Sequence, residues 1–167
     1  MAKVSTACIQ TRKITQKTCG QECVDWAIGL LEDGYDSHYL RLLIWMSPPF
    51  NHFEVASYRD GLLKELGFNK FDPAAWICEY SREQMQKVLK GELDLIETLQ
   101  EVSFLHESNG YIRGIQNFYL LLIAYEELNE LSQQWTWPGA TLENIHSIIQ
   151  AEMKKYVDSH RQGWNKP

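Results

Sequence analysis

Apolar residues at helical spacing, closed by glycine or proline, constrain this sequence most strongly, and the clearest examples fall within residues 22–67. Each of three runs there places apolar side chains three or four positions apart, so each run forms one face of a helix. Gly34 and Gly67 end the first and third runs, because glycine accepts the left-handed conformation found after helices, and Pro48-Pro49 cannot continue the second. Short links make such consecutive helices pack against one another. The runs are Val24, Ala27, Ile28 and Leu31; Tyr39, Leu42, Leu43 and Met46; and Val55, Tyr58, Leu62 and Leu66.

The remainder of the chain repeats this helical pattern. Asp72-Pro73 is a helix start, because aspartate caps the free N–H groups and proline fits the first turn. Residues 112–131 are apolar around most of a helix circumference, which is typical of a helix in the middle of a domain. We therefore predict an all-α fold, a single-domain bundle of about seven helices with a central apolar helix near 112–131. Trp135 and Trp137 are expected to fold back over the core.

The predicted α-helical domain covers residues 19–160, with a different composition at each end. Residues 1–18 are rich in Thr, Lys and Gln and contain no acid, which predicts a basic flexible arm, with a short strand or helix as the alternative. Residues 161–167 are predicted to be a frayed tail. The cations of the arm are Lys3, Arg12, Lys13 and Lys17.

Charge is distributed unevenly along the chain. The whole sequence carries −6, whereas the residues after position 18 hold 12 basic and 22 acidic side chains, a net charge of −10. From the acidic charge of residues 19–167 we predict that nucleic-acid binding is unlikely, because contacts between basic side chains and phosphates dominate that affinity. This charge favours a basic protein partner through electrostatic steering. Plain solubility is the simpler explanation of the same charge.

The composition is that of a globular protein, with 44% hydrophobic and 12% aromatic residues. The longest apolar run, residues 118–125, is far shorter than the roughly 18 residues of a membrane span. The N-terminus lacks the apolar block of a signal peptide. We therefore expect a cytoplasmic protein with reduced thiols and no membrane contact.

Acidic and tyrosine side chains gather around the predicted turn at Gly34. Tyrosine supplies rigid contact area and carboxylates supply complementarity to a basic surface, so we predict that these residues bind a partner. The alternative is that Asp36 only caps a helix while the others form a solvated face. Arg41, which has apolar neighbours, is expected to pair with one of these acids. The predicted partner-binding residues are Asp25, Glu32, Asp33, Tyr35, Asp36 and Tyr39.

Cys19 and Cys23 are four positions apart, a spacing that places two side chains on one helix face. A metal site or a disulfide is conceivable there, but zinc needs two further ligands and the remaining thiols, Cys8 and Cys78, are isolated. The redox motif C-x-x-C has two intervening residues rather than three. Buried, inactive thiols are the simpler interpretation, and a redox or metal role stays open.

No catalytic, cofactor-binding or metal-binding motif is found in the sequence. Glu143-x-x-His146 matches half of a di-iron helix-bundle signature, and the second Glu-x-x-His pair that such a site needs is missing. The sequence has no Gly-x-Ser-x-Gly elbow and no glycine-rich phosphate loop. We therefore predict no catalytic residue, no cofactor and no metal.

Residues 22–67 resemble a recurrent segment of small uncharacterised bacterial all-helical proteins, and this resemblance implies a helical fold without implying an activity. Some small acidic helical proteins of this kind serve as immunity partners of bacterial toxins, an analogy of fold and charge. The residues that carry the resemblance are Trp26, Gly34-Tyr35-Asp36-Ser37, Leu40-Arg41, Pro49, Phe53-Glu54-Val55, Tyr58, Leu62 and Glu65-Leu66-Gly67.

Three functional hypotheses remain at this point. The first is a non-enzymatic, acidic protein-interaction module, in particular an immunity-type inhibitor of a basic bacterial toxin. The second is a metal-dependent or other enzyme, which needs carboxylates or imidazoles clustered in a core pocket. The third is a regulatory protein that uses the basic arm, and the acidic body makes it the weakest. A homodimer through an apolar helix face is also compatible with the pattern.

Overall fold

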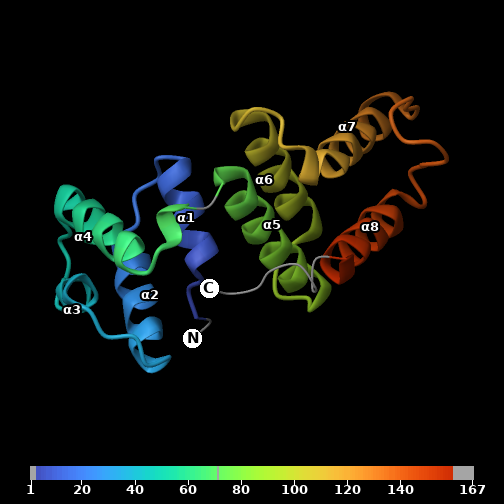
Figure 1. Cartoon of the computed structure of the whole chain (residues 1–167). Helices are drawn as coiled ribbons and strands as arrows, with labels where there is room; N and C mark the ends of the chain where they lie inside the picture. The colour runs from blue at the N-terminus through green and yellow to red at the C-terminus, as the bar shows by residue number, and fades with distance from the viewer. Residues whose placement is uncertain (1–2, 71, 160–167) are drawn as a thin grey trace. The chain divides into compact units, whose positions relative to one another are not determined.

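The computed structural model describes residues 3–70 and 72–159, and these residues form an all-helical protein (Figure 1). The all-α prediction is confirmed. The described residues contain eight α-helices rather than about seven, and the additional helix is α1. The elements are α1 Thr6–Ile14, α2 Gln21–Glu32, α3 His38–Ile44, α4 His52–Glu65, η1 Phe68–Lys70, α5 Pro73–Leu89, α6 Leu95–Ser108, η2 Arg113–Ile115, α7 Gln116–Leu131 and α8 Ile145–Ser159.

The chain divides into two compact units, residues 1–77 and 78–167, with the boundary inside α5. A single domain over residues 19–160 stays a prediction. The tail that the sequence predicts to be frayed, residues 161–167, lies outside the described residues. Among the helices of the described residues, none combines the length and the hydrophobicity that a membrane crossing requires.

Helices α2, α3 and α4 form the body of the first unit, and each begins or ends where the local chemistry predicts. The Ser37 hydroxyl accepts a hydrogen bond from the Leu40 N–H and caps α3. The Asn51 side chain accepts from the Phe53 and Glu54 N–H groups and caps α4. Helix α3 contacts both α2 and α4, as short links between consecutive helices favour.

Helix α1 occupies part of the segment that the sequence predicts to be a flexible arm, and a short helix was the stated alternative. Ser5 caps it by accepting from the Cys8 N–H. Ile9 is fully buried, and the Gln10 side-chain amide donates to the Phe68 carbonyl at 3.1 Å. The Nε1–H of Trp26 donates to the Thr6 hydroxyl at 3.0 Å, which fastens α1 to α2. The buried residues of α1 include only two apolar ones, Ala7 and Ile9, beside the polar Gln10 and Thr11. Two apolar residues are too few to give this segment a clear apolar period in the sequence.

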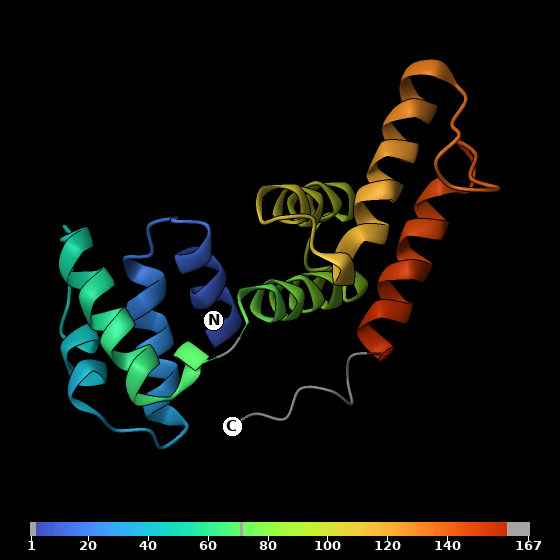
Figure 2. The same ribbon diagram turned by 45° about the horizontal axis from the view of Figure 1, so that its top comes forward.

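The second unit is built around α7, which contacts α6, η2 and α8. Helices α7 and α8 run side by side (Figure 2). The ring of Phe118 is buried and meets the ring of Tyr156 edge to face, with centroids 5.4 Å apart. The Ser103 hydroxyl of α6 donates to the Leu99 and Phe118 carbonyls, which satisfies a buried polar group at the α6–α7 contact. The Tyr80 hydroxyl of α5 donates to Glu101 of α6 at 2.8 Å.

The apolar surface of α7 is only partly buried. One face, made by Phe118, Leu121, Ala124 and Leu128, is closed off from solvent. Leu131 at the end of the helix is 61% exposed. Trp135 is 73% exposed, so the prediction that it covers the core is wrong. Its backbone N–H donates to the Glu127 carboxylate. Within its own unit α7 contacts α6, η2 and α8 with one face buried, and a central position in a single bundle stays a prediction.

Candidate functional site

The six predicted partner-binding residues lie in the first unit, around the connection between α2 and α3. Four of them, Glu32, Asp33, Tyr35 and Asp36, are exposed to solvent. Asp25 is half-buried on α2, where its carboxylate accepts from the Gln21 side chain at 2.9 Å. The structure therefore brings most of the predicted residues to one accessible connection. Whether they bind a partner stays a prediction.

Two of the exposed carboxylates already have cationic partners in this chain. Asp33 pairs with Lys3 at 2.6 Å. Asp36 accepts from the Arg41 guanidinium through both oxygens, as the sequence predicted for one of the acids, and these hydrogen bonds hold the pKa of Asp36 below its ordinary value. Both pairs are open to solvent, so they contribute little to stability. Their main effect is to reduce the negative charge offered to a partner.

Tyr39 is half-buried because it fills the space above a glycine of α4. A Cβ added at Gly61 would lie 2.6–2.7 Å from carbon atoms of the Tyr39 ring, closer than van der Waals contact allows. Glycine therefore lets α3 and α4 approach closely at this point. Tyr39 is thus occupied in packing, and Glu32 and Tyr35 are the more accessible of the predicted residues.

Gly61→Ala is expected to destabilise the protein by about 1–3 kcal/mol, because the new methyl group collides with the Tyr39 ring. In a Tyr39→Ala background the same substitution should stabilise by up to about 1 kcal/mol, since alanine has the higher helix propensity. Urea unfolding of the four proteins of this double-mutant cycle measures the coupling. Equal costs in both backgrounds would contradict the close approach.

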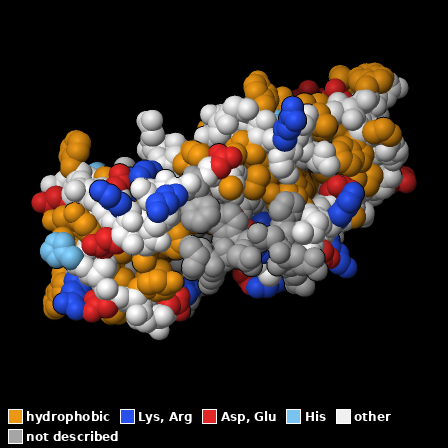
Figure 3. All heavy atoms as spheres, viewed as in Figure 1, with side chains coloured by type: hydrophobic (Ala, Val, Ile, Leu, Met, Phe, Trp, Pro, Cys, Tyr) orange, Lys and Arg blue, Asp and Glu red, His pale blue; other side chains and the backbone are white. Residues whose placement is uncertain are grey.

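Two large aromatic side chains lie almost fully in solvent at the two ends of the α3–α4 connection. Trp45 follows α3 and is 87% exposed, and Phe53 in the first turn of α4 is 89% exposed. Helix α3 has seven residues, about 10 Å of rise, and it separates the connection that carries Glu32 and Tyr35 from Trp45. We call Glu32, Tyr35, Trp45 and Phe53 the α3 surface. Apolar side chains lie among charged ones over the face of this unit seen in Figure 3.

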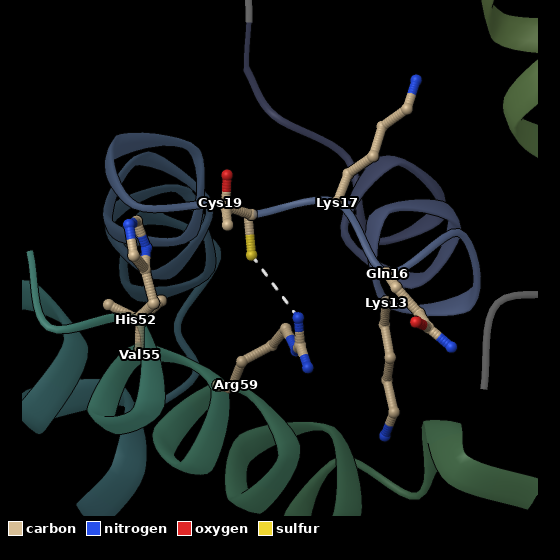
Figure 4. A pocket seen from close by; sticks show the side chains of 9 residues that line it. Lys13, Gln16, Lys17, Cys19, His52, Val55 and Arg59 are labelled. Carbon is tan, nitrogen blue, oxygen red and sulfur yellow. Dashed lines mark hydrogen bonds between the residues drawn. The ribbon is translucent and has the colours of Figure 1, made fainter.

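A second candidate site is a pocket of about 250 Å³ between the end of α1, the α1–α2 connection and α4, within the first unit. Cys19 and Arg59 line this thiol pocket, and the Arg59 Nη1 atom lies 3.6 Å from the Cys19 sulfur. Figure 4 shows Arg59 extending from α4 toward that sulfur, while the Lys17 ammonium points away. Cys23 lies behind Cys19 and is fully buried. Both cysteines are buried, Cys19 at 4% and Cys23 at 0% exposure, and Cys19 is the one that lines the pocket.

The charges around Cys19 favour its thiolate. The Cys23 thiol donates a hydrogen bond to it and Arg59 adds a hydrogen bond and a positive charge, which together lower the pKa of Cys19 to about 7 despite its burial. The same hydrogen bond, together with burial, raises the pKa of Cys23. Glu22 acts against both ionisations. Cys19 is therefore the sulfur that ionises more readily to a nucleophilic thiolate, and Cys23 stays a neutral thiol.

Sequence reasoning identified the two cysteines but missed Arg59. Its signal is its register on α4, because Val55, Arg59 and Leu62 fall on one helix face and all are buried. A cation on a buried face needs a partner. Arg59 has two, the Cys19 sulfur and the Asp60 carboxylate, which its Nε–H contacts at 2.9 Å. The sequence signal for this site is therefore an arginine within the apolar face of a predicted helix.

Within residues 3–70 and 72–159, no three or more His, Cys, Asp or Glu side chains cluster closely enough to hold a metal ion. Glu143 and His146 are both exposed, and the His146 ring instead meets the Tyr125 ring edge to face, with centroids 5.6 Å apart. Comparison of the chain with protein-family models, curated proteins and solved structures finds no match in any of the three. Functional inference therefore depends on the α3 surface and the thiol pocket.

Proposed function

We propose that this protein is a non-enzymatic interaction module whose α3 surface binds a basic protein. The observation that carries the proposal is the near-complete exposure of Trp45 and Phe53, at 87% and 89%. Burying a large aromatic side chain on folding stabilises a protein by several kcal/mol, so a chain that leaves two in water forgoes that stabilisation. Tryptophan is among the residues that contribute most binding energy in protein interfaces. An immunity-type inhibitor of a basic bacterial toxin is the member of this class that the acidic charge favours.

Charge supports the choice of a basic partner. The chain carries −6, and Glu32 and Glu54 add exposed carboxylates beside the aromatic residues. Exposed charges at the rim of an interface mainly accelerate association and set its salt dependence, whereas buried aromatic anchors supply affinity. We therefore assign recognition to Trp45 and Phe53 and steering to the acids. The carboxylates paired with Lys3 and Arg41 contribute less to this steering.

The regulatory alternative that uses a basic arm has less support. Three of the four cations of residues 1–18 pair with carboxylates of the first unit. Lys3 bonds Asp33 at 2.6 Å. The other two pairs are Arg12 with Glu22 at 2.8 Å and Lys13 with Asp60 at 3.2 Å. A phosphate backbone would have to compete with these carboxylates, which reduces the gain from nucleic-acid binding.

The double variant Trp45→Ala/Phe53→Ala is expected to lose partner binding by at least about 100-fold while unfolding at nearly the wild-type urea concentration, because both rings are in solvent. The measurement is affinity capture from the native host at low and high salt, followed by titration of the purified captured protein. The proposal expects a basic protein in a 1:1 complex that salt weakens. Trp135→Ala, an exposed tryptophan of the other unit, is the matched control and should bind normally.

Two outcomes would overturn the proposal. One is capture of the same proteins by the wild type and the double variant. The other is concentration-dependent self-association of the wild type that the double variant abolishes, since this would assign Trp45 and Phe53 to a homodimer. Sedimentation of the purified chain alone distinguishes self-association from binding of a basic partner.

A further inference from the structure

The thiol pocket contains the parts of a peroxide-sensitive dithiol. Cys19 precedes Gly20, the N-cap of α2, and Cys23 lies within the first turn of that helix. The chain turns between the two cysteines, since the Val24 N–H donates to the Gly20 carbonyl at 3.4 Å, and a disulfide spans Cα atoms about 4.4–6.8 Å apart. The two thiols interact directly, and this interaction is the largest cause of the pKa shift of each.

Cys19 is slightly more accessible than Cys23, at 4% against 0% exposure, and this is the order that a peroxide-reactive thiol and a resolving thiol require. Cys19 lines the pocket of about 250 Å³, which is large enough for a molecule of the size of hydrogen peroxide. Cys23 is fully buried behind it. An incoming oxidant thus meets Cys19 first, and Cys23 is protected from direct attack.

Charged groups of both signs surround Cys19, and Asp60 pairs with two of the cations, Lys13 and Arg59. Arg59 of α4 contacts its sulfur directly. Glu22 of α2 is the acid that opposes its ionisation. The remaining titratable side chains of the lining are Lys13, Lys17 and His52. Direct contact between a guanidinium and a cysteine sulfur is typical of reactive cysteines, whereas structural cysteines lie among apolar side chains.

We propose that Cys19 and Cys23 form a redox pair in which Cys19 reacts with a hydroperoxide and Cys23 resolves the product to a disulfide. The Cys19 thiolate attacks the terminal oxygen of the peroxide, and the O–O bond breaks. With hydrogen peroxide, one proton is taken up, water leaves and Cys19 becomes a sulfenic acid. The Cys23 sulfur then attacks the Cys19 sulfur, the S–O bond breaks, and a second water leaves with the Cys23 proton. Two thiols and one peroxide thereby give one disulfide and two waters.

The proposal also assigns a role to Arg59, which holds the thiolate through its hydrogen bond and charge without touching the oxidant in any required step. It is a positioning residue. Arg59→Gln should slow the reaction of Cys19 at pH 6.5 about fivefold, because the thiolate fraction falls while the intrinsic nucleophilicity of the thiolate rises. Arg59→Lys keeps the charge and should recover most of the rate.

The test treats the reduced full chain with hydrogen peroxide, blocks the remaining thiols by alkylation and maps the peptides by mass spectrometry. The expected product is the Cys19–Cys23 disulfide, formed before Cys8 and Cys78 change. In Cys23→Ser, dimedone should label Cys19, because the sulfenic acid has no resolving thiol. In Cys19→Ser, Cys23 should stay a thiol. The alkylation rate of Cys19 should rise with a midpoint near pH 7.

Cys8 and Cys78 are internal controls, because both are half-buried thiols of the same chain. Oxidation of these two before Cys19 in the folded protein would overturn the proposal. So would the absence of a dimedone adduct on Cys19 in Cys23→Ser, or equal oxidation rates in Arg59→Gln and the wild type. Unfolding curves of each variant, recorded under reducing conditions, show that a change in rate reports on chemistry rather than on loss of the fold.

Discussion

Phe118→Ala should lower the free energy of unfolding by about 3–5 kcal/mol, the usual cost of deleting a fully buried aromatic ring. The Phe118 side chain is 2% exposed and packs edge to face against Tyr156. Its removal leaves a cavity beside the Tyr156 ring of α8, while the bond from the Ser103 hydroxyl to the Phe118 carbonyl still holds α7 against α6. A loss of this size approaches the total stability of many domains.

Urea unfolding followed by circular dichroism measures this effect, and the midpoint should fall by about 2 M if the slope keeps its ordinary value. Phe104→Ala is the matched control, because it makes the same change in the same unit at a ring that is 55% exposed. It should cost less than about 0.5 kcal/mol. A loss below about 1 kcal/mol for Phe118→Ala would mean that the α7–α8 contact is not part of the core.

Helices with an apolar face and a capping residue could be predicted from the sequence because each signal is local. Asn51 and Asp94 show this, since both side chains accept hydrogen bonds from N–H groups two and three residues later. Helix α8 shows the limit of such signals. Thr141 is a plausible cap, yet the helix begins at Ile145, because Asn144 bonds back to the Thr141 N–H and the Gly139 carbonyl and forms a turn first.

The candidate sites could be predicted less well, because their chemistry depends on residues far apart in the chain. Tyr39 was predicted to face a partner, but Gly61 makes room for its ring. The guanidinium that contacts the Cys19 sulfur belongs to Arg59, 40 positions away, and no spacing rule connects the two. Trp45 and Phe53 stand outside the apolar runs on either side of Pro48-Pro49, and the coordinates show that both are almost fully exposed.

Trp26→Ala should also cost about 3–5 kcal/mol, and it tests the helix for which the sequence pattern is weakest. Trp26 is 1% exposed, and its Nε1–H donates to the Thr6 hydroxyl of α1 at 3.0 Å. Trp26→Phe keeps most of the apolar area but removes the donor, so it should cost about 1–2 kcal/mol. The difference between the two variants separates packing from the attachment of α1.

Hydrogen exchange identifies which helix loses stability when Trp26 is replaced. If the indole bond fastens α1, the amides of residues 9–14 should exchange faster in Trp26→Phe, while those of α4 change little. Trp45→Ala is the matched control, an indole of the same unit that is 87% exposed, and it should leave both stability and exchange unchanged. Uniformly fast exchange over α1 in the wild type would show that this segment is the flexible arm of the sequence prediction. The thiol pocket would then lose the wall that Lys13 provides.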